Sequence, residues 1–217
     1  LDGMAFMNTS YYADFDQTMD LSQDYRAIRW MQDNVQGTPV IVEANIVEYR
    51  WGTRFTMFTG LPGVVGWNWH QRQQRGVVST EWVTKRVDQV FQFYTTQNKD
   101  MVLAFLAEHG VKYIVVGQLE RGAYRGEGLN KFEEWNGELW NAVYRDGDTV
   151  IGLGVADVKL DYLCKAFALQ RVNRAALKKP VHLLATYSEE VGLVGAKAFA
   201  DAGLCRPEWA LCGEPSE

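Results

Sequence analysis

Cysteine, histidine and proline are scarce in this chain of 217 residues, which has three cysteines, three histidines and five prolines. The cysteines, Cys164, Cys205 and Cys212, are odd in number and form no CxxC pair, so we expect neither a disulfide framework nor a cysteine-based zinc site. Their simplest interpretation is as small buried apolar side chains. The sequence also lacks the run of about 20 apolar residues that a membrane-spanning helix needs.

Basic residues are also fewer than acidic ones, with 22 Lys and Arg against 27 Asp and Glu. The net charge is −5 and the isoelectric point is near 5.3, whereas a protein that binds a nucleic-acid backbone needs a basic surface. Hydrophobic residues make up 47% of the chain and charged residues 23%, as in ordinary folded proteins. The chain begins at Leu1 without a basic leader segment, which we interpret as a fragment boundary. These features predict one large or two small folded domains that bind no nucleic acid.

Residue usage changes near Ile151. Up to this residue the chain has 14 Lys and Arg against 19 Asp and Glu, and beyond it there are eight of each kind. Seven of the eight tryptophans precede the change and all three cysteines follow it, with no Pro- or Ser-rich linker between. One mixed domain is the plainest explanation. The alternative is two pieces of different origin, residues 1–151 and 152–217, joined between Thr149 and Gly154.

Hydrophobic periodicity in the first part predicts helices that alternate with short buried strands. Val83, Val87, Val90 and Tyr94 recur at the spacing of an amphipathic helix. We also expect helices over residues 24–35, 101–109 and 130–135, strands over 40–42 and 111–116, and a hairpin over 140–144 and 149–151, while residues 54–69 resist assignment. The pattern is typical of an α/β or α+β domain.

The second part contains three strand-like segments, over residues 152–156, 181–186 and 209–212, that each end in acidic residues. They lead to Asp157, to Glu189 and Glu190, and to Glu214, and a helix that ends at Ala202 is expected before the last strand. In an open α/β sheet these carboxylates meet at one edge, where a divalent metal would offset their repulsion. The alternative is that they only complement the dipoles of helix N-termini.

Three motifs in this part are Gly154–Lys159, Pro180–Gly192 and Gly213–Ser216. In this order they resemble motifs of the zinc aminoacylase/deacetylase family, which includes acetylornithine deacetylase and succinyl-diaminopimelate desuccinylase. The resemblance implies a partial α/β metallopeptidase-like catalytic half, with two zinc ions, that hydrolyses N-acyl amino acids. It makes Asp157 the carboxylate that bridges the zinc ions, Glu190 and Glu214 the ligands of one ion each, and Glu189 the general base.

The His-x-Asp ligand motif of that family has no counterpart in this sequence. The histidines are His70, His109 and His182, and none of them has an acidic residue two positions later. His182 falls within the predicted strand before the glutamate pair, where packing is a more natural role than zinc binding. Because zinc sites usually include nitrogen or sulfur ligands, we predict an incomplete site with little or no hydrolysis.

Five motifs are distributed over the first part, at residues 25–30, 39–43, 54–62, 66–75 and 113–117. Together they resemble the C-terminal extramembrane part of YYY-type membrane proteins, which are thought to be related to lipid-linked-sugar glycosyltransferases. The resemblance implies an extramembrane domain for residues 1–151, whereas residues 152–217 resemble a cytoplasmic enzyme. The two resemblances therefore leave the localisation open.

The motif at residues 66–75 combines aromatic and basic side chains beside a glycine-bearing loop. Aromatic faces suit sugar rings and guanidinium groups suit phosphate or carboxylate, so the motif is a candidate ligand surface. Its candidate residues are Trp67, Trp69, His70, Arg72 and Arg75, with Glu43 and Glu48 as possible acidic partners. The alternative is that the tryptophans anchor a core or an interface and the arginines form its solvated rim.

Three functions are consistent with these patterns. The first is a composite of an extramembrane domain from a glycosyltransferase-like membrane protein and an inactive half of a zinc amidohydrolase. The second is an active metal-dependent deacetylase or peptidase. The third is a non-catalytic module that binds a carbohydrate, sugar phosphate or lipid phosphate around Trp67–Arg75. An unpaired strand edge after Ile151 would also favour association between copies of the chain.

Overall fold

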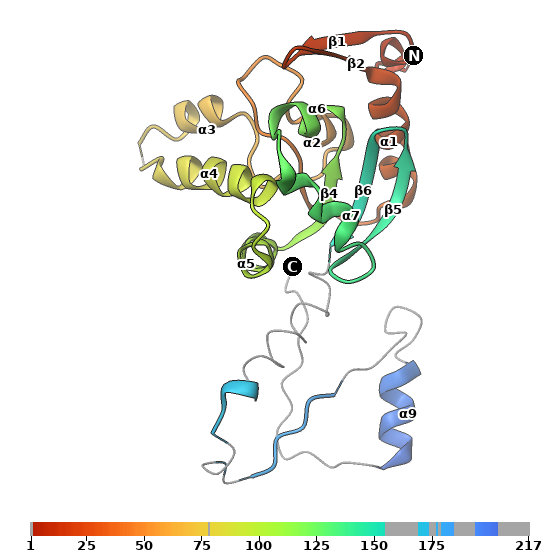
Figure 1. The fold of residues 1–217 in the computed structure, drawn as a ribbon, viewed down its shortest axis with the longest axis vertical. Helices are drawn as coiled ribbons and strands as arrows, with labels where there is room; N and C mark the ends of the chain where they lie inside the picture. The colour runs from red at the N-terminus through yellow and green to blue at the C-terminus, as the bar shows by residue number, and fades with distance from the viewer. Residues whose placement is uncertain are drawn as a thin grey trace. The chain divides into compact units, whose positions relative to one another are not determined.

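The computed structural model describes residues 2–77, 79–154, 169–173, 177, 179–184 and 194–203. The chain divides into two compact units, Leu1–Ala156 and Asp157–Glu217. The first unit holds every described strand and all but one of the labelled helices, and Figure 1 shows its helices packed around the strands. This unit carries the candidate site described below.

The centre of the first unit is a four-stranded sheet with the strand order β3-β4-β6-β5. β3 (Val40–Val42) runs parallel to β4 (Val111–Val116), whereas β6 (Thr149–Gly154) is antiparallel to both β4 and β5 (Trp140–Asp146). The strands that we predicted at these places are confirmed, and so is the broad α/β class. Residues 149–154, where we expected a junction, form a strand that is paired on both sides within the first unit.

A separate hairpin near the N-terminus was not anticipated. β1 (Tyr11–Asp14) pairs with β2 (Gln17–Asp20) in antiparallel register. The two residues between them, Phe15 and Asp16, have φ angles of 52° and 58°. Two consecutive positive φ angles give the turn whose twist matches that of a hairpin. The sequence gives no signal for this turn, because Phe15-Asp16 is not the Asn-Gly or Asp-Gly pair that usually forms it.

Opposite faces of the central sheet bury different sets of side chains. On one face, α1 (Leu21–Asn34) packs Ile28 and Met31 into a buried cluster with Val115 and Ile151. Neighbouring residues of β4 point the other way, as alternation along a strand requires, and Ile114 lies near Phe132 and Trp140. The sheet is therefore covered on both faces, as in other α/β folds.

The predicted helices are present, with shifted ends. α1 begins earlier than expected because the Asp20 side chain caps it, accepting a 2.9 Å hydrogen bond from the Ser22 amide. α4 (Glu81–Thr95), α5 (Lys99–His109) and α7 (Lys131–Glu134) lie where periodicity placed them. The unassigned stretch 54–69 contains α2 (Arg54–Thr59) and the start of α3 (Asn68–Gln74). Three further short helices were not predicted: η1 (Ala5–Asn8), α6 (Gln118–Ala123) and η2 (Glu127–Leu129).

In the second unit the structure tests few of our predictions. α9 (Val194–Ala202) ends at the expected residue, and Gly203 follows it with a φ of 59°. Residues 181–184 form neither helix nor strand, so this part of the predicted strand is wrong, and His182 is exposed rather than packed. The strand predicted at 209–212 and the three cysteines lie outside the described residues. No described helix combines the length and the apolar character of a membrane-spanning segment.

Lys131 is a fully buried amine at the start of α7. Its Nζ donates hydrogen bonds to the carbonyl oxygens of Tyr94 (2.9 Å) and Gly128 (2.7 Å) and lies 4.5 Å from the centre of the Phe132 ring. Burial lowers the pKa of Lys131 to about 7, because a charged amine loses its hydration there. Folding is therefore linked to the protonation of this one side chain.

We expect the domain to become more stable as pH rises from about 7 towards 10. In this window the unfolded chain keeps the Lys131 proton that the folded chain has released, so the unfolded state binds more protons. Replacing Lys131 by methionine removes this dependence. Between pH 7 and pH 9 we expect wild type to gain about 1–2 kcal/mol relative to Lys131→Met, measured by urea unfolding. Parallel pH profiles of the two proteins would contradict the prediction.

Candidate functional site

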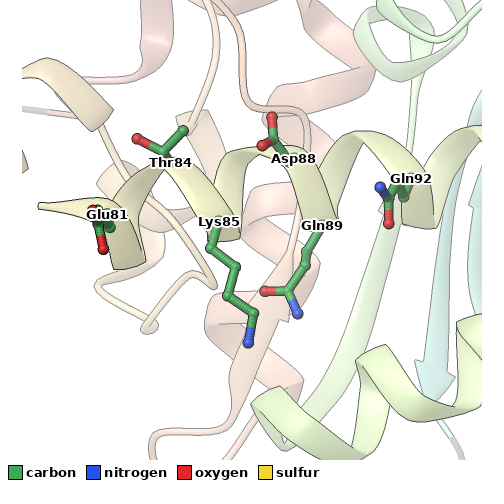
Figure 2. A pocket seen from close by; sticks show the side chains of 6 residues that line it. All are labelled: Glu81, Thr84, Lys85, Asp88, Gln89 and Gln92. Atoms are coloured by element: carbon green, nitrogen blue, oxygen red, sulfur yellow. The ribbon is translucent and has the colours of Figure 1, made fainter.

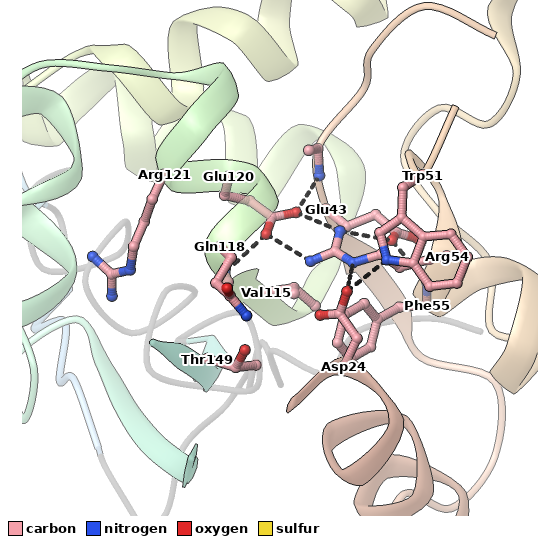
Figure 3. Close-up of polar contacts among 12 residues, drawn as sticks. Asp24, Glu43, Trp51, Arg54, Phe55, Val115, Gln118, Glu120, Arg121 and Thr149 are labelled. Carbon is pink, nitrogen blue, oxygen red and sulfur yellow. Dashed lines mark hydrogen bonds and ion pairs between the residues drawn. The ribbon is translucent and has the colours of Figure 1, made fainter. Parts of the chain in front are cut away.

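A buried charged cluster lies at the carboxyl ends of the two parallel strands. Arg54, with no exposed surface, donates from Nε to Asp24 Oδ2 (2.7 Å) and from both terminal nitrogens to the Glu120 carboxylate (2.9 Å each). The third carboxylate, Glu43, follows β3 directly, and its Oε2 lies 3.8 Å from Arg54 Nη1. Figure 3 shows the three acids arranged around the single guanidinium.

The backbone and one indole satisfy the remaining acceptors of this cluster. Glu43 accepts the amides of Phe55 and Thr56 at the first turn of α2, at 2.9 and 2.7 Å. Glu120 accepts the amides of Ala44 and Gly117, at 2.8 Å each. Asp24 also accepts the Trp51 indole N–H at 2.7 Å. The Arg54 cluster, meaning Arg54 with Asp24, Glu43 and Glu120, thus fixes both ends of the loop from Glu43 to Thr53.

The two glutamates of the Arg54 cluster have pKa values shifted in opposite directions. Burial opposes ionisation of Glu120, but the Arg54 guanidinium outweighs it and lowers the pKa of Glu120 below its usual value. For Glu43 burial wins, and its pKa is raised despite the attraction of Arg54. The cluster is buried and hydrogen-bonded within the protein, so it supports the fold rather than binding a ligand. Our prediction that Glu43 pairs with the arginines of residues 66–75 is therefore wrong.

Tyr49, an exposed residue of the loop held by this cluster, meets two half-buried rings, Trp67 and His70, from the start of α3. We call these three residues the aromatic site. The ring centres are 5.3 Å apart for Tyr49 and Trp67, 5.1 Å for Trp67 and His70, and 5.5 Å for Tyr49 and His70. The Tyr49 hydroxyl and His70 Nε2 share a 2.8 Å hydrogen bond. Three rings from two separate segments therefore meet edge to face at the surface.

Local backbone geometry presents Tyr49 to solvent. Its φ angle is 63°, a left-handed conformation that a bulky residue seldom adopts, and its side chain is 73% exposed. Hydrogen bonds on both sides hold this loop: Glu48 Oε1 accepts the Trp69 amide at 2.7 Å, and Asn45 Nδ2 donates to the Gly66 carbonyl at 2.9 Å. Strain at an exposed ring is an observation that points to function.

The structure places only two of the five predicted ligand residues, Trp67 and His70, in the aromatic site. Trp67 and His70 come together with Tyr49, which sequence reasoning missed, and Glu48 supports them through the Trp69 backbone. Trp69 itself is 52% exposed. Arg75, which directly follows α3, has its guanidinium 5.0 Å from the centre of the Trp82 ring on α4.

Arg72 combines burial with an unmet hydrogen-bonding group. Among the described residues, its buried Nε has no hydrogen-bond partner, and neither has Oε1 of the adjacent Gln71. A buried donor without a partner is costly unless something accepts from it. Arg72 lies two residues after His70 on α3, so the unmet donor and the His70 ring of the aromatic site belong to the same short helix.

The acidic residues of the predicted zinc site do not belong to the part of the chain that the structure describes. Asp157, Glu189, Glu190 and Glu214 lie outside the described residues, so their role as zinc ligands and general base stays a prediction. Within the described ranges no group of His, Cys, Asp and Glu side chains is arranged to hold a metal ion.

A shallow groove also runs along the outer face of α4. Figure 2 shows the side chains that line it, all of them polar: Glu81, Thr84, Lys85, Asp88, Gln89 and Gln92. Two of them bond to α5, since Glu108 accepts from Lys85 Nζ (2.8 Å) and from Gln89 Nε2 (2.7 Å). We interpret this face as the solvated side of an amphipathic helix.

Comparisons with known proteins give limited information. The sequence matches no known protein-family model. A solved structure similar to this chain is the C-terminal globular domain of an oligosaccharyltransferase from Archaeoglobus fulgidus, with a TM-score of 0.40 and 14% identity. The match covers 60% of this chain and 95% of that domain. Similarity at this level assigns neither a family nor a function to this chain.

Proposed function

We propose that the first unit is an extramembrane ligand-binding domain of a glycosyltransferase-like membrane protein, and that its aromatic site binds a sugar phosphate. The motifs in residues 1–151 support the first half of this proposal through their resemblance to YYY-type proteins. The observation that carries the second half is the meeting of Tyr49, Trp67 and His70 at an exposed, strained loop.

The chemistry of the site suits a sugar ring. Aromatic faces offer apolar contact to the C–H groups of a pyranose, while the Tyr49 hydroxyl and the His70 ring provide polar edges for its hydroxyl groups. The Glu43–Thr53 loop is anchored at both ends by the Arg54 cluster, so little ordering is needed on binding. A preorganised binding surface is more consistent with this arrangement than an acid–base catalyst.

The charge around the site favours a negatively charged ligand. The stretch between Glu48 and Glu81 contains four arginines and no Asp or Glu. Arg54 is neutralised by the buried acids and Arg50 pairs with Asp14, so we assign Arg72 as the cation that meets the ligand. Arg72 supplies a guanidinium whose Nε has no partner among the described residues. A phosphate group would accept from it, since arginine matches phosphate geometry well.

Calorimetric titration of the full chain tests the proposal. We expect a hexose 1-phosphate to bind more tightly than the methyl hexoside, and Arg72→Ala to remove that difference while Arg29→Ala, an exposed arginine of α1, leaves it intact. Comparing the hexose 1-phosphate with a farnesyl-phosphoryl hexose distinguishes a free from a lipid-linked ligand. Equal binding of the phosphorylated and neutral sugars by wild type would contradict the phosphate assignment.

A further inference from the structure

The turn between α3 and α4 carries the most exposed large apolar side chain in the described part of the chain, Val77, which is 99% exposed. The two helices form a hairpin that extends from the body of the first unit, and this turn is its outer end (Figure 1). The hairpin tip, defined as Arg75, Val77, Trp82 and Arg86, shares no residue with the aromatic site.

Two arginines flank the tryptophan of the hairpin tip. The guanidinium of Arg75 lies 5.0 Å from the centre of the Trp82 ring, and that of Arg86 lies 5.1 Å from it. Arg86 also donates from Nη1 to the Val64 carbonyl at 3.2 Å, which ties the first half of α4 to the segment before α3. The tip therefore combines the exposed Val77 with an indole that carries two cations, Trp82.

Local charge at the hairpin differs in sign from that of the whole chain. Residues 66–86 contain four basic residues and one acidic residue, Glu81, while the chain as a whole has a net charge of −5. A cationic tip on an acidic protein is complementary to an anionic surface. Nucleic acid is a poor candidate, because the remaining negative surface would repel it.

We propose that the hairpin tip docks on an anionic lipid bilayer. Val77 enters the headgroup region, Trp82 lies at the interface, where indole rings are favoured, and Arg75 and Arg86 contact lipid phosphates. One exposed valine and two arginines give a weak, salt-sensitive attachment rather than a stable anchor. This inference does not rest on the sugar-phosphate site, because neither the three rings of that site nor Arg72 belongs to the tip.

Vesicle co-sedimentation of the full chain tests the proposal. At low ionic strength we expect binding to phosphatidylcholine vesicles that contain about 30% phosphatidylserine, and little binding to pure phosphatidylcholine. Val77→Asp and Arg75→Glu should each lower the partition coefficient about fivefold or more. Met101→Asp changes an exposed apolar residue of α5 in the same way and should have no such effect.

Each possible result of this experiment either supports or overturns the proposal. Loss of binding with Val77→Asp but not with Met101→Asp, together with weakening by salt, supports the proposal. No sedimentation of wild type with the anionic vesicles overturns it. Equal vesicle binding by wild type and Val77→Asp also overturns it. So does a result in which Val77→Asp alters self-association of the protein while neither protein binds vesicles.

Discussion

Replacing Arg54 by methionine is expected to lower the free energy of unfolding by about 3–5 kcal/mol, as measured by urea denaturation. The substitution leaves Asp24, Glu43 and Glu120 together in the interior without the guanidinium that contacts all three. Their backbone and indole donors remain, but like charges at close range then repel one another without compensation. Since a domain of this kind is stable by about 5–15 kcal/mol, the loss is a large fraction of the total.

Two further variants make this result interpretable. Arg54→Lys keeps the charge but cannot form the paired hydrogen bonds to Glu120, so we expect an intermediate loss. Lys85→Met removes a cation from an exposed pair with Glu108 and should change stability little. An Arg54→Met protein as stable as the Lys85→Met protein would show that the cluster does not hold the loop.

The second large effect concerns Tyr49. We expect Tyr49→Ala to weaken the binding of a hexose 1-phosphate at least tenfold, about 1.4 kcal/mol or more, because it removes one of three rings and the partner of His70. Tyr49→Phe keeps the ring and loses only the hydrogen bond, so its effect should be smaller. Both are measured by calorimetric titration of the full chain.

Tyr11 provides a matched control for this prediction. It is 70% exposed, close to the 73% of Tyr49, and lies on β1 rather than in the site. Tyr11→Ala should therefore leave sugar-phosphate binding unchanged. If both alanine variants lose affinity equally, the loss reflects general damage to the surface, and the assignment of Tyr49 to the site is wrong.

Regular elements with local signals were predictable from the sequence. Val83, Val90 and Tyr94 are all buried on α4, as their spacing required, and the run Val111–Val116 forms β4. The short helices α2 and α3 were missed, since each is too short to show a full period and glycine and proline lie between them. Their stability comes from tertiary contacts, such as Glu43 at the start of α2.

Only part of the candidate site was predictable, because its third ring also depends on a tertiary contact. Trp67 and His70 share one motif, so the sequence pointed to them together. Tyr49 reaches them through a strained loop 21 residues before His70, and composition gives no sign of that contact. Arg54 likewise pairs with Asp24 and Glu120, which are 30 and 66 residues away. Long-range pairing of this kind depends on the fold and has no local signal.

The central claim is that a sugar phosphate binds where Tyr49, Trp67 and His70 meet. Nuclear magnetic resonance of the isotope-labelled full chain, titrated with a hexose 1-phosphate, tests it most directly. We predict shifts of the Trp67 indole and His70 ring signals, while the buried Trp140 indole, which donates to the Phe132 carbonyl, stays unchanged. Absence of any shift at Trp67 and His70, or shifts confined to other parts of the domain, would contradict the account.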